Sequence, residues 1–184
     1  MRKFLAAAWE VCEVVFVAVA TVFLIRTFIV QPFYVSGASM EPTFEDGNYL
    51  LVDEITPRLN GFSRGQVVVF RPPVGERTFY IKRIIGLPGD RVISQDGRIR
   101  IIRGDTSFVL DEPYLDPSLR SDDSFDVTLS SDQYFVMGDN RLHSYDSRTW
   151  GALSTGNIIG TVRVRLWPAN DIGLFTAPAY APVP

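Results

Sequence analysis

The sequence predicts a mainly β protein in which an N-terminal transmembrane helix precedes an antiparallel, β-barrel-like domain. Two observations predict this fold. Residues 4–30 are strongly apolar and contain neither proline nor glycine. After residue 30, short runs of β-branched and aromatic residues alternate with turns rich in glycine, proline and aspartate. We therefore expect a membrane anchor over residues 1–30 and a β-rich domain over residues 31–184.

The composition limits the classes of protein to which the chain can belong. Its 184 residues suit one compact domain with a short appendage, and 46% apolar against 21% charged residues argues against disorder. The net charge of −3 and the scattered basic residues disfavour nucleic-acid binding. Cys12 is the only cysteine and His143 the only histidine, so no intrachain disulfide can form and a structural zinc site is disfavoured.

The proposed anchor is interrupted by Glu10, Glu13 and Arg26. Its longest uncharged run, residues 14–25, has 12 residues, whereas a membrane span needs about 20. A continuous helix over residues 4–30 would nevertheless be about 40 Å long, which is enough to cross a bilayer. The charged side chains would then lie near the two interfaces.

Two alternatives to an uncleaved anchor are a cleaved signal peptide and a buried helix of a soluble domain. We prefer the anchor because acidic residues lie inside the apolar segment and the bulky sequence "QPFYV" follows it. Arg2 and Lys3 precede the segment. By the positive-inside rule, they predict a cytoplasmic N-terminus and a β domain on the other side of the membrane.

The β domain is expected to contain strands in six regions: residues 48–55, 63–73, 77–86, 91–102, 132–140 and 156–168. Residues 91–102 read as a hairpin with Asp96 and Gly97 at its turn, and residues 91–132 as a hairpin-and-loop excursion. The last region is expected to be irregular as far as Thr161 and then to alternate as a strand.

Two further segments are expected to lack regular structure. Residues 111–126 are acidic and contain two prolines, and we prefer a solvated surface loop or small excursion to a cation site there. The tail from Asn170 is expected to fray.

Ser39, in "SGASMEPT" over residues 36–43, is the first candidate for chemistry. Gly37 allows the backbone to approach a ligand closely, and Pro42 favours an extended residue before it. Such a loop can expose both the hydroxyl and the N–H of Ser39, although similar clusters are mostly ordinary turns. A serine hydroxyl also needs a general base, because it is barely nucleophilic alone.

Two residues could supply that base. His143 has Asp139 and Asp146 nearby in sequence, so a Ser–His–Asp triad can be written. Lys82 lies in the apolar strand "TFYIKRII", where lost hydration disfavours the ammonium form and a pKa near about 8 would make the amine a base. We prefer Lys82, although a lysine at a sheet edge could also extend into water.

The segment "GDNRLHSYDSRTWG", residues 138–151, follows an apolar strand and is rich in polar residues. Asp146 and Arg148 could form an ion pair, and Ser144 could hydrogen-bond a neighbouring amine. A polar loop held by its own side-chain hydrogen bonds would have the same composition. The two interpretations are compatible, because a catalytic lysine needs rigid support.

Taken together, these segments resemble the bacterial type I signal peptidase family, in its glycine-bearing branch. The matching segments are "SGASMEPT", "RGQVVVF" (64–70), "YIKRIIGLPGD" (80–90) and "GDNRLHSYDSRTWG", with "RTFIVQPFYV" resembling the anchor-to-domain junction. The resemblance covers residues 26–160. This chain departs from the family pattern at Gln66, Leu142 and His143, and none of these positions is catalytic in the family.

The resemblance implies a role for each matching residue. Ser39 would be the nucleophile and Lys82 the general base, Ser144 would orient the lysine, and Asp146 and Arg148 would form a supporting ion pair. The backbone N–H of Ser39 would contribute to the oxyanion hole. Gly37 occupies the position from which some members supply a second donor.

The resemblance also implies an activity and a location. The protein would be a membrane-bound serine endopeptidase that removes signal peptides from exported preproteins, after small residues at −1 and −3, through an acyl-enzyme. Its partners would be signal peptides, the lipid bilayer and, by proximity, the secretion translocase, with no nucleic acid, metal or cofactor. The alternatives are another Ser–Lys peptidase, such as a self-cleaving repressor domain, and an inactive single-pass protein that displays a binding domain.

Overall fold

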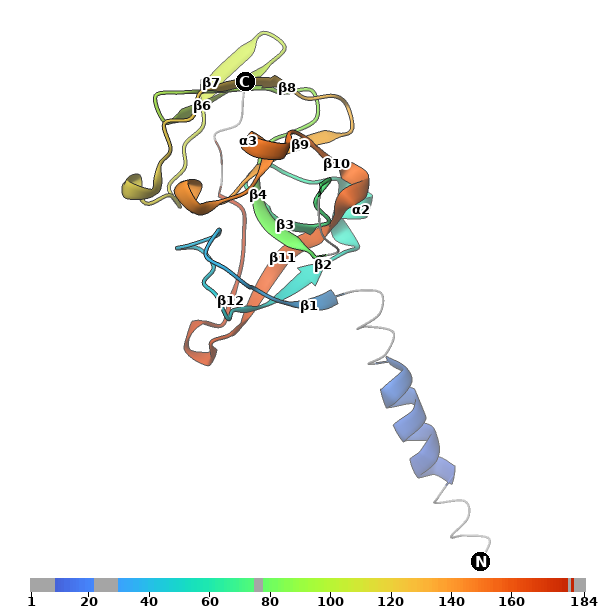
Figure 1. Ribbon diagram of the computed structural model, residues 1–184. Coiled ribbons are helices and arrows are strands. Elements are labelled where there is room, and N and C mark those ends of the chain that lie inside the picture. Colours follow the sequence, from blue (N-terminus) through green and yellow to red (C-terminus); the bar gives the residue numbers. More distant parts are fainter. Residues whose placement is uncertain (1–8, 22–29, 75–77, 179, 181–184) are drawn as a thin grey trace, which may run out of the picture.

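The computed structural model describes residues 9–21, 30–74, 78–178 and 180, and its β domain consists of two antiparallel sheets (Figure 1). The larger sheet has the order β1 (Val30–Tyr34), β2 (Tyr49–Asp53), β11 (Ile158–Trp167), β3 (Val67–Phe70), β4 (Tyr80–Gly86), β9 (Gln133–Met137) and β10 (Leu153–Ser154), and β12 (Gly173–Leu174) pairs with β11. The smaller sheet has the order β7 (Thr106–Val109), β6 (Arg98–Arg103), β5 (Arg91–Gln95) and β8 (Phe125–Thr128).

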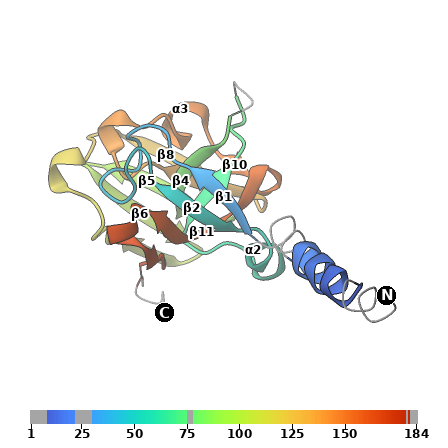
Figure 2. The ribbon, with the colours of Figure 1, turned by 90° about the horizontal axis from the view of Figure 1, so that it is seen from below.

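Short helical turns occupy the connections between these strands. They are α2 (Thr56–Asn60), η1 (Pro117–Leu119), η2 (Arg141–His143), α3 (Ser147–Trp150), η3 (Thr155–Asn157) and η4 (Ala169–Asp171). The prediction of a mainly β, antiparallel domain is therefore confirmed. The larger sheet is strongly curved, as the view from below shows (Figure 2).

A strand is present in every region where the sequence predicts one. The hairpin of β5 and β6 turns at Asp96 and Gly97, which both have a positive φ, as a two-residue hairpin turn requires. One detail of the prediction is wrong, because β11 is already a strand from Ile158 rather than from Thr161.

The core of the larger sheet forms where its strands bury both faces. All four residues of β3 are buried, and β4 is buried from Lys82 to its end at Gly86. A continuous apolar run of this kind suits a strand covered on both sides. Consequently, any polar side chain on β4 must find its partners inside the protein.

Asp90 joins the two sheets. Its fully buried carboxylate accepts hydrogen bonds from Arg64, at 2.8 Å, and from Arg103 on β6, at 2.7 Å. It also accepts from the backbone N–H of Leu87, at 2.7 Å. Asp90 thereby fixes the turn that leads from β4 in the larger sheet to β5 in the smaller one.

Two expectations about irregular segments are wrong. Residues 111–126 do not form a solvated loop throughout, because Glu112 and Leu115 are buried and η1 lies within the segment. The described part of the tail is ordered beyond Asn170, since β12 pairs with β11 and Phe175 packs against the ring of Phe44. Residues 179 and 181–184 of the tail lie outside the described residues. In both segments the side chains gain partners that lie far away in the sequence.

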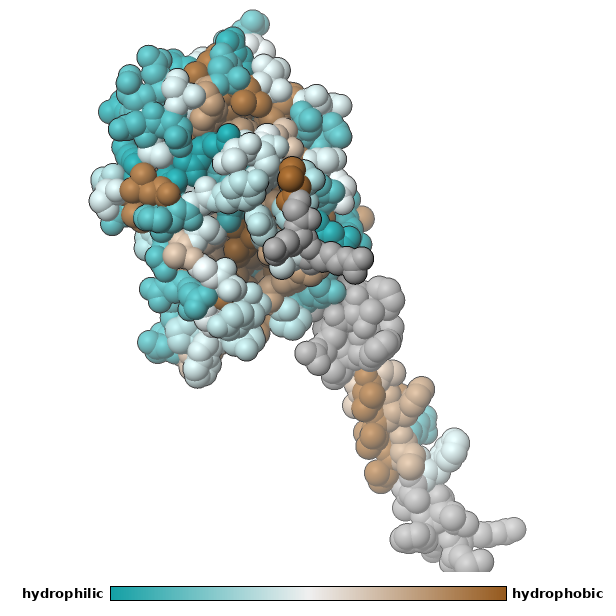
Figure 3. Space-filling model, viewed as in Figure 1, coloured by the Kyte–Doolittle hydropathy of each residue, from teal (hydrophilic) through white to brown (hydrophobic). Residues whose placement is uncertain are grey.

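Residues 9–21 are helical, and their large apolar side chains are exposed. In Figure 3 this helix is largely hydrophobic, whereas the β domain shows a mixed and mostly polar surface. Within the described part of the chain, no helix has the length and apolar character needed to cross a bilayer. The proposed anchor also includes residues 1–8 and 22–29, which lie outside the described residues.

Candidate active site

β4 positions the candidate base. Lys82 pairs with Val68 on β3, and its side chain is only 4% exposed. Alternation along the strand sends Lys82 and Arg83 to opposite faces. Lys82 lines a groove on one face, and Arg83 points into a buried polar cluster on the other.

The loop after β1 positions Ser39. The backbone N–H of Val35 donates to the carbonyl of Asn48, at 2.9 Å, and this hydrogen bond joins the two ends of the loop. Met40 and Phe44 are buried in the core and anchor the far side. Gly37 has a φ of 96°, a conformation that favours glycine, and its N–H donates to Asp46 at 2.7 Å.

The two candidate residues meet directly. Lys82 Nζ lies 2.6 Å from Ser39 Oγ and donates a second hydrogen bond to the carbonyl of Ile81 at 2.9 Å. Burial lowers the pKa of Lys82 to about 8, and this effect outweighs the nearby carboxylates of Asp146 and Asp139, which raise it. The neutral amine is therefore accessible near physiological pH, within reach of a serine hydroxyl.

Ser39 and Lys82 open onto a groove of about 740 Å³. Its apolar lining includes Phe33, Val69 and Ile81, and the backbone of residues 36–38 forms one wall. A groove of this size and composition can hold several residues of an extended peptide beside the hydroxyl. The arrangement is suited to nucleophilic attack on a bound peptide carbonyl.

The loop after β9 holds the Ser39 loop from the other side. Asn140 donates from its backbone N–H to the carbonyl of Ser39 and from Nδ2 to the carbonyl of Ala38, each at 3.1 Å. A Cβ at Gly138 would overlap the carbonyl oxygen of Ser39 and the hydroxyl of Ser144. Gly138 therefore allows the two loops to approach more closely than any side chain would permit.

Asp146 and Arg148 form the ion pair that the sequence predicts. Arg148 Nε and Nη2 donate to the two carboxylate oxygens of Asp146, both at 2.8 Å. Burial would raise the pKa of Asp146, but the hydrogen bonds and charge of Arg148 hold it below its ordinary value. Asp146 also accepts from the backbone N–H of Gly138 at 3.0 Å, so the pair fixes the loop that carries Asn140.

Ser144 lies beside the site, but it does not make the expected hydrogen bond to the amine of Lys82. Its hydroxyl is buried and contacts Gly138, but it has no hydrogen-bond partner among the described residues. Both hydrogen bonds of the lysine amine go instead to Ser39 and Ile81. A role for Ser144 in orienting Lys82 therefore remains a prediction.

His143 does not face Ser39 in a triad. Its Nδ1 lies 3.2 Å from Oδ1 of Asn140, although the ring does line the groove. Asp139, the other residue of that hypothetical arrangement, accepts from Arg83 at 2.8 and 2.5 Å and from the hydroxyl of Thr43 at 2.6 Å. The triad interpretation is therefore not supported by this geometry.

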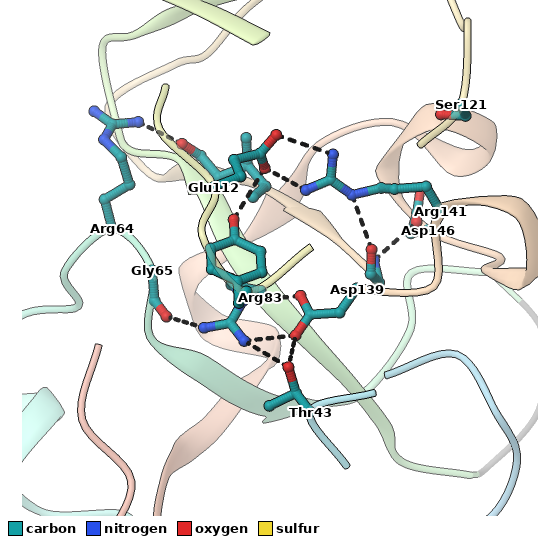
Figure 4. Close-up of polar contacts among 12 residues, drawn as sticks. Thr43, Arg64, Gly65, Arg83, Glu112, Ser121, Asp139, Arg141 and Asp146 are labelled. Atoms are coloured by element: carbon teal, nitrogen blue, oxygen red, sulfur yellow. Dashed lines mark hydrogen bonds and ion pairs between the residues drawn. The ribbon is translucent and has the colours of Figure 1, made fainter. Parts of the chain in front are cut away.

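The buried cluster around Arg83 was not predicted from the sequence. Figure 4 shows Arg83 between Asp139, Thr43 and the carbonyl of Gly65, with a second pair, Glu112 and Arg141, nearby. Three members of the cluster lie within the segments that resemble the family, namely Thr43, Arg83 and Asp139. That resemblance is the sequence signal that marks them as candidates. Glu112 lies outside those segments and carries no comparable signal.

Metal ligands are not gathered in the part of the chain that the structure describes. No group of three or more histidine, cysteine, aspartate or glutamate side chains is placed there to hold an ion. The acidic residues near the site are instead paired with arginines, as in Asp139 with Arg83 and Asp146 with Arg148.

Comparison with known proteins shows the family to which the chain belongs. Residues 8–167 match the family described as signal peptidase, peptidase S26. A signal peptidase I of Bacillus amyloliquefaciens is 37% identical over 91% of this chain and 92% of its own length, and signal peptidase I U of Bacillus subtilis is 36% identical over 83% and 84%. A signal peptidase I of known structure, from Enterococcus faecalis, is 27% identical and aligns with a TM-score of 0.47 over 54% of this chain and 95% of that one. The family match covers most of the sequence, and the relatives match over nearly their full lengths. The chain is therefore a peptidase that belongs to the S26 family of signal peptidases.

Proposed function

We propose that this protein removes N-terminal signal peptides from exported preproteins, with Ser39 as the nucleophile and Lys82 as the general base. The observation that carries the proposal is the 2.6 Å separation of Lys82 Nζ and Ser39 Oγ at the floor of a peptide-sized groove. Cleavage would follow small residues at −1 and −3, as the family resemblance implies. The apolar part of the groove is suited to receive such side chains.

The reaction would proceed in two halves. Neutral Lys82 takes the proton from Ser39 Oγ as this oxygen attacks the scissile carbonyl carbon, and the ammonium then gives that proton to the leaving amine nitrogen. The carbon–nitrogen bond breaks and an ester with Ser39 remains. Water then attacks the ester, Lys82 takes the proton of that water, and the proton returns to Ser39 Oγ as the acid product leaves.

The negative charge that develops on the carbonyl oxygen needs hydrogen-bond donors. We assign the backbone N–H of Ser39 to this oxyanion hole. The N–H of Gly37 already donates to Asp46, so Gly37 contributes the open, left-handed backbone that lets a substrate approach. Its missing side chain leaves free space at that position, since a Cβ there would meet no atom within 4 Å.

Asp146 and Arg148 would support the reaction indirectly. Their ion pair holds Gly138, and the same loop carries Asn140 and Ser144 against the Ser39 loop. We propose that Ser144 keeps the lysine amine oriented once a substrate has displaced the present contacts. Such support matters because a misplacement of about 1 Å can cost about a hundredfold in rate.

A cleavage assay with the full chain in detergent tests the Ser39 and Lys82 assignments. A preprotein with an Ala-x-Ala site should be cut after the second alanine by the wild type. Ser39→Ala and Lys82→Ala should each lower kcat by at least about a thousandfold, as the loss of a nucleophile or base does in other serine peptidases. His143→Ala should cut normally. Normal cleavage by Ser39→Ala, or loss with His143→Ala but not with Lys82→Ala, would overturn the assignments.

The proposed location is the cell membrane. A single span within residues 1–30 would leave the N-terminus in the cytoplasm and residues 31–184 outside, near the bilayer, the signal peptides and the secretion translocase. The exposed apolar side chains of residues 9–21 favour contact with lipid. Protease added to sealed spheroplasts should digest the β domain, and protection of that domain would contradict this topology.

A further inference from the structure

Glu112 is a buried carboxylate that the proposed reaction does not use. It lies between β7 and η1, and the residue is only 7% exposed. Arg141 donates to it from Nη1 at 3.3 Å and from Nη2, and the hydroxyl of Tyr114 donates to Oε1 at 2.9 Å. A carboxylate is rarely buried to this degree without paired charges, so its partners indicate its role.

Through Arg141, Glu112 connects to the loop that holds Ser39. Nε of Arg141 donates to the carbonyl of Gly138 at 3.0 Å. Asn140, which directly precedes Arg141, makes both hydrogen bonds to the Ser39 loop. The position of Arg141 therefore affects the position of Asn140, whose backbone N–H binds the carbonyl of Ser39.

Through Tyr114, Glu112 also connects to the strand that carries Lys82. The guanidinium carbon of Arg83 lies 3.8 Å from the centre of the Tyr114 ring, which is close for a cation over an aromatic face. Arg83 in turn donates to the carbonyl of Gly65 and to Asp139, and at 3.3 Å to the hydroxyl of Thr43. Thr43 lies in the same loop, four residues after Ser39, whose carbonyl Asn140 holds.

The cluster contains two arginines and two carboxylates, and each arginine is paired with one carboxylate. Arg83 pairs with Asp139 and Arg141 pairs with Glu112 (Figure 4), and all four side chains are buried. Tyr114 bridges the two pairs, because its hydroxyl donates to Glu112 and its ring faces Arg83. Arginine forks hold such partners in defined orientations, because several donors act in one plane. Two points of the Ser39 loop, at residues 38–39 and at Thr43, are thereby tied to one rigid group.

Attachment of the segment to the core does not require these polar groups. Leu110 and Leu115 are buried on either side of Glu112, and Leu110 packs in the core of the smaller sheet. A buried ion pair is often no more stabilising than apolar side chains of similar size. The presence of Glu112 is better explained by the groups that it orients than by the stability that it adds.

We propose that Glu112 and Tyr114 are positioning residues, which hold Arg141 and Arg83 so that the Ser39 loop stays in register with Lys82. This inference rests on the proposed roles of Ser39 and Lys82. It assigns a function to the segment after β7, which contacts neither the groove nor the dyad.

The experiment uses the full chain in detergent, with the variants Glu112→Gln, Glu112→Asp and Tyr114→Phe. Asp111→Asn is the matched control, because Asp111 is the exposed acidic neighbour. Glu112→Gln should lower kcat on an Ala-x-Ala peptide by about ten- to a hundredfold, with KM within about twofold, since the groove is unchanged. Glu112→Asp should recover part of the loss, and Tyr114→Phe should lower kcat by about three- to tenfold.

Hydrogen exchange gives a readout that does not depend on cleavage. The amides of residues 36–44 and 138–141 should exchange faster in Glu112→Gln and Tyr114→Phe than in the wild type or Asp111→Asn. The proposal fails if kcat stays within about twofold of wild type in both variants, or if exchange in these segments is unchanged. If Glu112→Gln does not fold, the kcat and the exchange rates of Tyr114→Phe test the proposal, because this variant removes only one hydroxyl. Full activity of Ser39→Ala would refute the dyad instead, and the exchange result would remain interpretable.

Discussion

At the scale of single residues, Lys82 shows how burial changes the proton affinity of an amine. Its pKa falls from 10.5 to about 8, which corresponds to roughly 3 kcal/mol of interaction lost by the charged form. This net value already includes the opposing effect of the nearby carboxylates of Asp146 and Asp139, which raise the pKa. The amine next to Ser39 therefore binds a proton less tightly than an ordinary lysine does. A larger fraction of it is neutral near physiological pH.

The pH dependence of activity should report this lowered pKa. The reaction needs neutral Lys82, so kcat/KM should rise with pH, reach half its maximum near pH 8 and level off above it. At pH 6 it should be roughly a hundredfold below the plateau, because the neutral fraction falls tenfold for each pH unit. The measurement is kcat/KM for an Ala-x-Ala peptide between pH 5.5 and 9.5.

His143→Gln is the control for this profile. A free histidine titrates near about 6.5, so a midpoint close to that value, lost in His143→Gln, would identify the histidine as the base. An unchanged midpoint near pH 8 in His143→Gln is the expected result. The sequence favours Lys82 over His143 as the base, because Lys82 has apolar neighbours whereas His143 lies in a polar loop.

At the scale of elements, the site depends on the end of β9. The strand stops at Met137, opposite Arg83 on β4, and the next residue, Gly138, passes between Ser39 and Ser144. Beyond it, Asp139 pairs with Arg83, and Asn140 binds the Ser39 loop. The end of β9 therefore connects the buried cluster to the loop that carries Ser39.

Gly138→Ala should disturb this junction. The added methyl group would overlap the carbonyl oxygen of Ser39, which is backbone and cannot simply rotate away. We expect a loss of about 1–3 kcal/mol in the free energy of unfolding, together with at least a tenfold fall in kcat. Gly156→Ala is the matched control, because a Cβ there meets no atom within 4 Å. Equal behaviour of the two variants in urea unfolding and in cleavage would show that the close approach is unimportant.

The sequence predicted the elements whose patterns are local. β4, β9 and the β5–β6 hairpin were identified because apolar runs and an Asp–Gly turn are visible without knowledge of the fold. β1 was missed as a strand because it contains Pro32, which a strand at the edge of a sheet tolerates. The start of β11 was misread because bulges break its alternation, and Gly160 lies where the backbone of Asp53 approaches.

Residues whose partners are distant in sequence could not be placed from the sequence alone. Glu112 looked like part of a solvated acidic loop, since nothing near it in the chain shows that Arg141 covers it. The geometry of Ser144 also could not be derived, because it depends on how closely two loops approach at Gly138. Motif resemblance found the catalytic candidates, but only the fold shows what holds them.

At the scale of the whole molecule, two sheets and a returning tail enclose the polar cluster. Asp90 links the sheets on one side through Arg64 and Arg103. After β12 the chain returns across the cluster, with Phe175 against the core of the larger sheet and Tyr180 against the core of the smaller one. The tail thus connects both cores, which explains why it is ordered where fraying was expected.

Phe175→Ala tests whether this tail contributes to the stability of the domain. The Phe175 ring lies 4.6 Å from that of Phe44, and its backbone N–H donates to the carbonyl of Arg163 at 2.7 Å. Because the side chain is half-buried, its removal should lower the free energy of unfolding by about 1–3 kcal/mol, less than for a fully buried phenylalanine. Leu174→Ala is the neighbouring control, and with its side chain 83% exposed it should change stability by no more than about 0.5 kcal/mol. Urea unfolding of both variants gives the comparison. A loss of similar size for the two would mean that the tail lies on the surface without packing, whereas a loss confined to Phe175→Ala would establish the tail as part of the folded domain.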